Sequence, residues 1–283
     1  MSVVKQILSQ VDHLPAAPRV AQQVLQLVSD PNFSFKALME TVRLDPGVTA
    51  HVLRMCNSPY YGLRRKVSSL QEALTYLGTN AVVDIVLTSQ VVGVYKKSHE
   101  GYRLASGELW RHSMAVALMA QSLGEKRKYK EVPTLFTAAL LHDVGKLILS
   151  QYVKEEFSRI EKLVIEEGKS FVEAEREVLG VDHALLGALV ARHWNFPEPI
   201  ARAIAFHHAP EITTEDRLLT SLVALSNLLV TTVGVGRGAV GLAVPMPAGL
   251  LKELNLKSRD VAELLLEVKD IIDNAEDLLS LAQ

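Results

Sequence analysis

Apolar residues recur along this chain at the spacing of amphipathic helices. They follow one another at intervals of three and four residues, which places their side chains on one face of a helix. An early example is the series Val20, Val24, Leu27 and Val28. The sequence has no alternation of apolar and polar residues over the length of a strand. The pattern therefore predicts an all-α fold of packed helices.

Five or six helices are predicted in the first hundred residues, and proline, glycine and capping residues mark their ends. They are a helix at 19–29, a short one after Ser34, a third beginning at Asp45-Pro46, a fourth after the capping-box pattern of Ser68 or Ser69 with Glu72, and a fifth at 81–95. Gly78-Thr79-Asn80 is expected to separate the last two.

The polar, glycine-containing segment 96–107 is the predicted connection between two helical parts, 1–97 and 107–283. In the second part, helices are predicted at 108–124, from Pro133 to His142-Asp143, at 155–167, at 171–179, after Asp182, and at 200–208, 216–233 and 258–282. The last helix carries apolar residues on one face and acids on the other. It could form a homodimer as a short coiled coil or cover the core of its own domain.

The composition is that of a globular protein without a general affinity for polyanions. A content of 48% apolar residues in 283 supports a sizeable buried core. The net charge of −2 gives no electrostatic reason to bind nucleic acid or an anionic membrane, and the basic run Arg64-Arg65-Lys66 is short. We therefore expect no nucleic-acid partner. Cys56 is the single cysteine, which excludes an internal disulfide and makes a cysteine-based zinc site implausible.

The sequence has no feature of a secreted or membrane protein. Its first residues lack a basic segment followed by a long apolar core. The longest apolar tract, 218–235, is interrupted by serine, asparagine and threonine, which favours a helix in the protein interior over a membrane span. We expect a cytoplasmic protein.

One apolar helical run ends in a pair of candidate metal ligands, His142-Asp143, followed by Gly145 and Lys146. An imidazole nitrogen and a carboxylate oxygen suit a divalent transition metal, and a carboxylate can also bridge two ions. Adjacent residues of a helix point about 100° apart, so the pair needs partners from other helices. The alternative is a helix C-terminus in which Gly145 stops the helix and Lys146 compensates the dipole. The pair alone leaves both interpretations open.

Further candidate ligands lie on other predicted helices of the second part. Helical bundles commonly build metal sites from inward-facing side chains. The predicted ligand set is His112, His142, Asp143, His183, His207 and His208. It would take a divalent metal such as Fe, Mn, Zn or Ni, and we expect no organic cofactor. The remaining histidines, His13, His51, His99 and His193, lack such company and are predicted to be structural or surface residues.

The order of these ligands resembles that of the HD phosphohydrolase superfamily, and more closely its HD-GYP branch. Motifs in the first part narrow the resemblance to the HDOD family, a relative of HD-GYP. These motifs are Leu14-Pro15, Asp45-Pro46, Asn57-Ser58, Tyr61-Gly62 and Leu77-Gly78, joined in the second part by Gly180-Val181-Asp182-His183, Trp194, Pro197 and His207-His208. The resemblance spans about residues 10–230.

Resemblance to this family implies a phosphodiesterase-like helical bundle with an N-terminal helical subdomain. It also implies a bacterial regulatory or signal-transduction role together with other signalling proteins. The family's HD pattern ends in an aspartate ligand, whereas Asn227 occupies that position here. Ala209-Pro210-Glu211-Ile212 replaces the Gly-Tyr-Pro stretch that follows the double histidine in HD-GYP proteins. A neutral amide is a poorer metal ligand than a carboxylate.

We therefore predict a non-catalytic signalling protein with a vestigial metal site. The alternative is a metal-dependent phosphohydrolase or cyclic-dinucleotide phosphodiesterase. In such an enzyme Asp143 would ligate or bridge the metal ions, and Lys146 would neutralise a phosphate oxygen.

Overall fold

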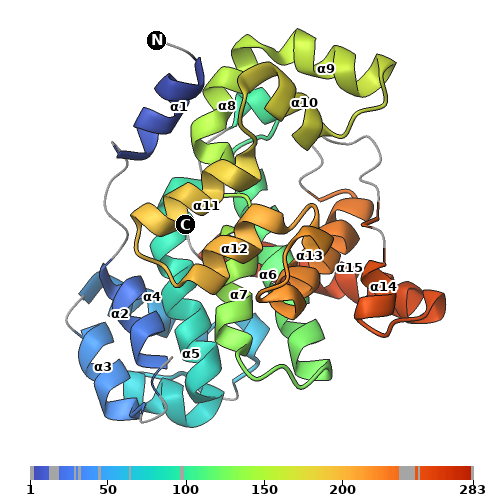
Figure 1. Cartoon of the computed structure of the whole chain (residues 1–283). Helices are drawn as coiled ribbons and strands as arrows, with labels where there is room; N and C mark the ends of the chain where they lie inside the picture. Colours follow the sequence, from blue (N-terminus) through green and yellow to red (C-terminus); the bar gives the residue numbers. More distant parts are fainter. Residues whose placement is uncertain are drawn as a thin grey trace.

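The regular structure of this protein is helical, as the apolar spacing predicts (Figure 1). This computed structural model describes residues 3–12, 19–28, 30, 33–43, 46–63, 65–95, 99–235, 246–247 and 249–281. Helices account for 76% of the chain, and the described residues contain no β-strand, only an isolated bridge between His99 and Leu104. His13, the motif Leu14-Pro15, Asp45 and Arg64 lie outside the described residues.

The first part of the chain folds into the helices that its caps predict, with one addition. Its elements are α1 (Val3–Asp12), α2 (Arg19–Val28), α3 (Phe35–Arg43), α4 (Pro46–Cys56), η1 (Pro59–Tyr61) and α5 (Leu70–Tyr95). α1 is the addition. Gly78, with φ 78° and ψ 174°, kinks α5 where an interruption is predicted. Glu72 N donates to Ser69 Oγ at 3.2 Å, and the Glu72 carboxylate accepts from Ser68 N at 2.7 Å, which confirms the capping pattern.

The second part differs from the prediction mainly after His142-Asp143. Its elements are η2 (Glu100–Tyr102), α6 (Glu108–Lys126), α7 (Val132–Leu141), α8 (Lys146–Glu155), α9 (Phe157–Glu166), α10 (Phe171–Leu179), α11 (His183–His193), α12 (Glu198–Phe206), η3 (Pro210–Ile212), α13 (Arg217–Thr232), α14 (Leu250–Glu253) and α15 (Ser258–Leu281). The chain turns at 142–145 and enters α8 at once, although no helix is predicted there. α8 forms because it buries an apolar face that includes Leu149 and Val153.

α6 is the central helix of the second part. It packs against α7, α13 and α15. All its residues from Leu109 to Ala120 are buried with the exception of Arg111. A helix that is apolar on nearly all sides is stable only with neighbours on all sides. The sequence of α6 therefore places His112 inside the bundle.

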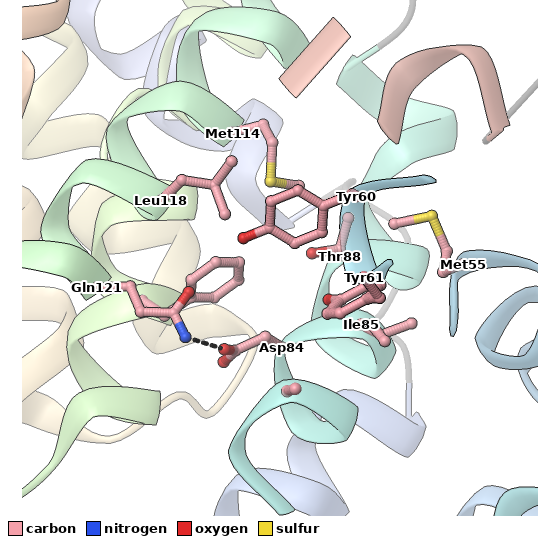
Figure 2. Close-up of a pocket in the computed structure, with 11 residues that line it drawn as sticks. Met55, Tyr60, Tyr61, Asp84, Ile85, Thr88, Met114, Leu118 and Gln121 are labelled. Atoms are coloured by element: carbon pink, nitrogen blue, oxygen red, sulfur yellow. Dashed lines mark hydrogen bonds between the residues drawn. The ribbon is translucent and has the colours of Figure 1, made fainter. Parts of the chain in front are cut away.

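Contacts of α5 with α6 and α7 join the two parts of the chain. At this junction Gln121 Nε2 donates a hydrogen bond to Asp84 Oδ2 at 3.1 Å (Figure 2). α1, in contrast, packs against α8 and α11 of the second part. The buried apolar residues form one cluster that extends from Ile7 to Ala275. The division at 96–107 stays a prediction, and residues 96–98 lie outside the described part of the chain.

The most apolar stretches of the chain lie in this core. One stretch of the described residues, Val132–Glu155, is long and apolar enough to cross a membrane, and 83% of its apolar window is buried within the protein. It comprises α7, the turn and α8. The tract predicted as an interior helix forms α13, and residues Leu219 to Val230 of this helix are buried.

The turn at 142–145 lies directly on the start of α11. Gly145 has a φ of −63°, so its backbone conformation would accept alanine. A Cβ atom at this position would nevertheless stand 2.0 Å from the His183 carbonyl oxygen and 2.7 Å from Gly187 N. The absence of a side chain at Gly145 therefore permits the contact that brings His142-Asp143 beside His183.

We predict that Gly145→Ala destabilises the protein by about 2 kcal/mol or more, because the backbone of α11 must move to admit the methyl group. Gly124→Ala is the matched control, since its Cβ would meet the end of the Leu135 side chain rather than backbone. Urea unfolding followed by circular dichroism measures both variants. A Gly145→Ala variant as stable as the wild type would contradict the close packing.

Candidate metal centre

His112 extends from α6 into the candidate centre, and a hydrogen bond of its Nδ1 atom fixes the orientation of the ring. The residue is 2% exposed. Nδ1 donates a hydrogen bond to the Val235 carbonyl oxygen at 3.0 Å, an assignment that gives the neutral ring its proton on Nδ1. Nε2 is directed inward and lies 3.5 Å from Asp143 Oδ2. The ring is therefore oriented for use as a ligand.

His142 and Asp143 occupy the first two positions of the turn after α7. His142 Nδ1 donates to the Ala139 carbonyl oxygen at 2.7 Å, and its Nε2 lies 3.2 Å from Asp143 Oδ2. Asp143 is 1% exposed, and its Oδ1 lies 3.4 Å from His183 Nε2. The carboxylate thus stands among histidines from three parts of the chain.

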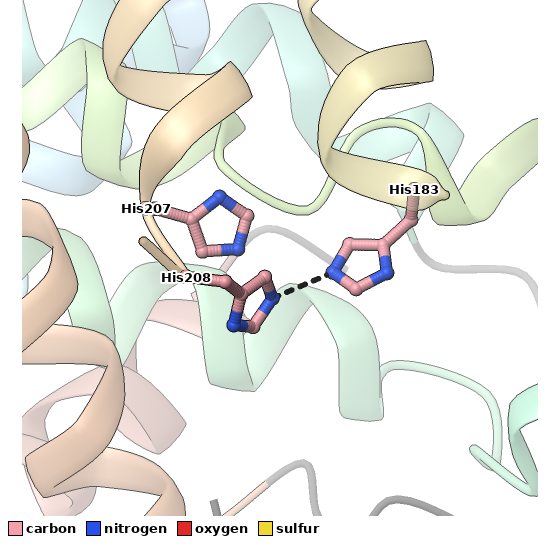
Figure 3. A group of neighbouring side chains, drawn as sticks. All are labelled: His183, His207 and His208. Atoms are coloured by element: carbon pink, nitrogen blue, oxygen red, sulfur yellow. Dashed lines mark hydrogen bonds between the residues drawn. The ribbon is translucent and has the colours of Figure 1, made fainter. Parts of the chain in front are cut away.

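The other histidines come from the ends of α11 and α12. His183 is the first residue of α11, where Asp182 caps the helix as predicted by accepting a bond from Leu185 N at 2.7 Å. His207 and His208 follow the last residue of α12, which ends two residues earlier than predicted. Figure 3 shows their rings beside His183, whose Nε2 lies 2.9 Å from His208 Nε2.

The six predicted ligands gather into two adjoining groups. The first is His112, His142 and Asp143, and the second is His183, His207 and His208. Within each group the candidate ligand atoms lie within 4.8 Å of one another. The contact between Asp143 and His183 joins the groups. Each group has the dimensions of one metal site, while the role of these residues as ligands stays a prediction.

Three buried atoms of the centre have no hydrogen-bond partner: His142 Nε2, His207 Nε2 and Asp143 Oδ1. In both histidines Nδ1 donates to a carbonyl three residues earlier, that of Ala139 or Ile204, at 2.7 Å. Their Nε2 atoms therefore carry lone pairs. A buried acceptor without a partner costs about 1–3 kcal/mol. A divalent cation satisfies imidazole lone pairs and a carboxylate oxygen together, so these residues fit a metal.

Burial keeps most of the imidazoles neutral, which is the form that binds a metal. It lowers the pKa of His112 to about 3 and holds the pKa values of His207 and His208 well below their ordinary range. Burial would raise the pKa of Asp143, but the electrostatic effects of the His142 ring and of the Lys146 ammonium outweigh it and hold this pKa well below its ordinary range. The centre therefore combines one carboxylate with mostly neutral rings.

Lys146 does not compensate a helix C-terminus, which is the role that one interpretation of the sequence gives it. It is the first residue of α8 rather than a residue at the end of α7, and a helix dipole disfavours a cation there. Its ammonium group is buried and donates a hydrogen bond to Asp143 Oδ2 at 2.7 Å. That interpretation is therefore wrong, because a carboxylate and not a helix end holds the lysine.

Asn227 lies beside the first group of ligands. α13 places its Oδ1 3.1 Å from His112 Nε2, and the same oxygen accepts a bond from Thr231 Oγ1 at 3.2 Å. An asparagine can present either its oxygen or its NH₂ group to the ring. Whichever atom faces His112, the contact adds no negative charge to the first group.

Glu175 belongs to the centre, although it is not among the ligands and site residues predicted from the sequence. This buried residue of α10 accepts hydrogen bonds from His183 N at 3.0 Å, His183 Nδ1 at 2.7 Å and the Tyr102 hydroxyl at 2.5 Å. Burial lowers the pKa of His183, but the charge and hydrogen bond of Glu175 outweigh it and raise this pKa. The carboxylate thus orients His183 so that its Nε2 faces the centre. The sequence gives one indication of this role: Glu175 is an acidic residue on the apolar face of α10.

Of the histidines predicted to be structural or surface residues, the three that the structure describes lie outside the centre. His193 is exposed at the end of α11, His51 is half-buried on α4, and His99 is buried next to η2. None of these three belongs to either ligand group found in the described residues.

Several solved structures share this architecture. An HDOD domain protein with unknown function from Geobacter sulfurreducens is 26% identical, with a TM-score of 0.70 over 95% of this chain and 97% of that one. A protein from Shewanella amazonensis SB2B, provisionally named a phosphohydrolase, is 24% identical, with a TM-score of 0.73 over 98% of both chains. A protein from Marinobacter aquaeolei VT8, provisionally named a signal transduction protein, is 22% identical, with a TM-score of 0.77 over 100% of this chain and 61% of that one. The class defined by the fold is an all-helical protein of the HD type.

The chain belongs to the HDOD domain family. The sequence model of this domain matches residues 14–210. A curated relative, an uncharacterized protein from Treponema pallidum (strain Nichols), is 20% identical over 225 residues, and the match spans 43% of the length of that relative. The family resemblance and the all-α fold class predicted from the sequence are thereby confirmed.

We predict that Glu175→Gln weakens the binding of a divalent metal by roughly 10- to 100-fold, because His183 loses the charge that orients its ring. Glu177→Gln is the matched control, since Glu177 lies exposed on the same helix and pairs with Lys169. Competition with a chromogenic chelator measures both dissociation constants. Equal affinities of the two variants would exclude a positioning role for Glu175.

Proposed function

We propose that this protein is a cytoplasmic regulator of bacterial signal transduction that acts through contacts with other signalling proteins. In this proposal its His/Asp centre holds a divalent metal for a structural or regulatory purpose and does not hydrolyse phosphate esters. Membership of the HDOD family and the name of the Marinobacter relative support the signalling assignment. A homodimer through α15 is compatible with the proposal, because this helix carries the exposed residue Leu266.

The observation that carries the proposal is the closure of the centre. Five of the six candidate ligands are at most 2% exposed, and His208 is half-buried. A catalytic metal needs a coordination position that water or substrate can reach from solvent. The burial of these ligands leaves little room for a phosphate ester to approach the centre, which favours a structural or regulatory role.

The charges of the centre support the same conclusion. His112, His142 and Asp143 would hold one ion, and His183, His207 and His208 a second. A bound metal supplies positive charge and Lewis acidity. Asp143 is the one carboxylate of the six ligands, and Lys146 already pairs with it at 2.7 Å. Even with the carboxylate of Glu175 behind His183, two dications would remain largely uncompensated in a buried site.

A metal-dependent phosphohydrolase, including a cyclic-dinucleotide phosphodiesterase, is the second candidate function. The close grouping of all six ligand residues favours it, and so does the name of the Shewanella relative. In that case the Lys146 ammonium would leave Asp143 and neutralise a phosphate oxygen. The two functions therefore differ in whether the centre opens to a substrate.

Hydrolysis assays distinguish the two functions. We predict that the protein supplied with manganese or iron hydrolyses cyclic dinucleotides, nucleotides and bis(4-nitrophenyl) phosphate no faster than its His142→Ala and Asp143→Ala variants. A rate that both substitutions reduce by about 100-fold or more would establish the phosphohydrolase instead. Affinity capture from the native bacterium tests the other half of the proposal, which fails if no signalling protein is recovered under any growth condition.

We predict that Asn227→Asp raises the affinity for a divalent metal by about tenfold or more, because it adds a negative charge in contact with His112. In the presence of EDTA the same charge is buried without a cation, so the melting temperature should fall below that of the wild type. Asn255→Asp, at an exposed position, is the control for the added charge. An unchanged affinity of Asn227→Asp would place Asn227 outside the metal site.

A further inference from the structure

A small polar cavity lies at the junction of the two parts of the chain and shares no lining residue with the His/Asp centre. Its volume is about 30 Å³, enough for one or two guests of the size of water. The residues that give it polar walls are Tyr60 and Tyr61 of η1, Asp84 and Thr88 of α5, and Gln121 of α6. The cavity therefore touches elements from both parts of the chain.

Asp84 is a buried carboxylate without a compensating charge. It is 4% exposed, and its Oδ1 has no hydrogen-bond partner, while Oδ2 accepts the bond from Gln121. None of the described residues that line the cavity carries a positive charge. An ionised carboxylate in such surroundings is costly unless a cation or a proton neutralises it. The cavity next to Oδ1 has room for a cation.

Hydroxyl groups provide further oxygen atoms around the same space. Figure 2 shows the hydroxyl oxygens of Tyr60, Tyr61 and Thr88 turned toward the cavity that Asp84 lines. Burial raises the pKa of both tyrosines, and the negative charge of Asp84 contributes to each increase. Both tyrosines and Asp84 line the same cavity. A hydroxyl oxygen has lone pairs that can face a cation.

We propose that this cavity binds one monovalent alkali cation, held by Asp84 and by the hydroxyl oxygens of Tyr60, Tyr61 and Thr88. Hard cations take oxygen ligands, and a single positive charge balances a single carboxylate. A dication would leave excess positive charge beside apolar walls such as Phe136. Mg²⁺ in addition keeps several of its waters, for which the cavity has no room.

The cation would fasten η1 to the junction of α5 and α6. The loop that carries η1 is already held at its base by Asn57, whose side chain donates to the Val67 carbonyl oxygen at 2.8 Å and accepts from Val67 N at 2.7 Å. Tyr60 and Tyr61 extend from this loop to the cavity. The cation site would thus explain the Asn57-Ser58 and Tyr61-Gly62 motifs: Asn57 holds the loop, and Tyr61 lines the cavity. The His/Asp centre does not explain these motifs.

Melting temperatures in different salts test the proposal on the full chain. EDTA is present throughout, so that divalent metals at the His/Asp centre do not contribute. At equal ionic strength, potassium or sodium chloride at about ten times the dissociation constant should raise the melting temperature by about 3 °C over N-methylglucamine chloride. Asp84→Asn, which preserves the size of the side chain, should abolish the rise. Asp270→Asn, at an exposed position of α15, should preserve it.

Thallium(I), a probe for alkali cations, gives a direct measurement. Crystals of the wild type soaked in thallium(I) acetate should show an anomalous peak between Asp84 and the tyrosine hydroxyls, and crystals of Asp84→Asn should show none there. Equal melting temperatures in the three chlorides would overturn the proposal, as would a rise that survives in Asp84→Asn or the lack of a thallium peak in the wild type. A wild type stabilised only by lowering the pH would mean that a proton neutralises Asp84, and this outcome also overturns the proposal.

Discussion

The arrangement of this protein depends on one buried carboxylate, that of Asp143. Burial of an ionised group is costly unless charged and polar partners surround it. Lys146 supplies a full charge at 2.7 Å, and rings of His142, His183 and His112 lie at 3.2, 3.4 and 3.5 Å from the carboxylate oxygens. These partners belong to α6, α8, α11 and the turn after α7. The four elements must therefore pack in one arrangement for the carboxylate to stay ionised.

Helix ends, more than helix faces, position the ligands. His142 follows α7 and His207 follows α12, and in both cases Nδ1 donates to a carbonyl three residues earlier at 2.7 Å. The last turn of each helix thereby satisfies one of its free carbonyl groups and turns Nε2 into the bundle. His183 obtains the same orientation from Glu175, which accepts its Nδ1 proton at 2.7 Å. These three histidines, like His112, are oriented before any metal binds, which lowers the entropic cost of binding one.

The sequence predicts the fold and the grouping of candidate ligands better than it predicts their surroundings. Apolar spacing and caps locate most helices, and the order of the histidines places six residues that do lie together. Lys146 and Glu175 escape this reasoning for a physical reason: their roles come from tertiary contacts with Asp143 and His183. A glycine followed by a lysine, as in Gly145-Lys146, also occurs at ordinary helix C-termini. The local sequence therefore does not show that α8 begins at Lys146. The role of Asn227 likewise comes from a tertiary contact, that of its side-chain amide with His112.

Two of the buried carboxylates, those of Asp143 and Asp84, have opposite character, and the contrast clarifies both sites. The pKa of Asp143 is held well below its ordinary range because His142 and Lys146 outweigh burial, whereas the pKa of Asp84 is raised well above it by burial and by Glu125. Asp143 therefore needs no further cation to stay ionised, because Lys146 pairs with its Oδ2, and a metal at its centre would find Oδ1 without a partner. Asp84 has no such cationic partner among the described residues that line its cavity. A cation from solution thus has more to gain electrostatically at the junction of the two parts than at a centre whose carboxylate is already paired.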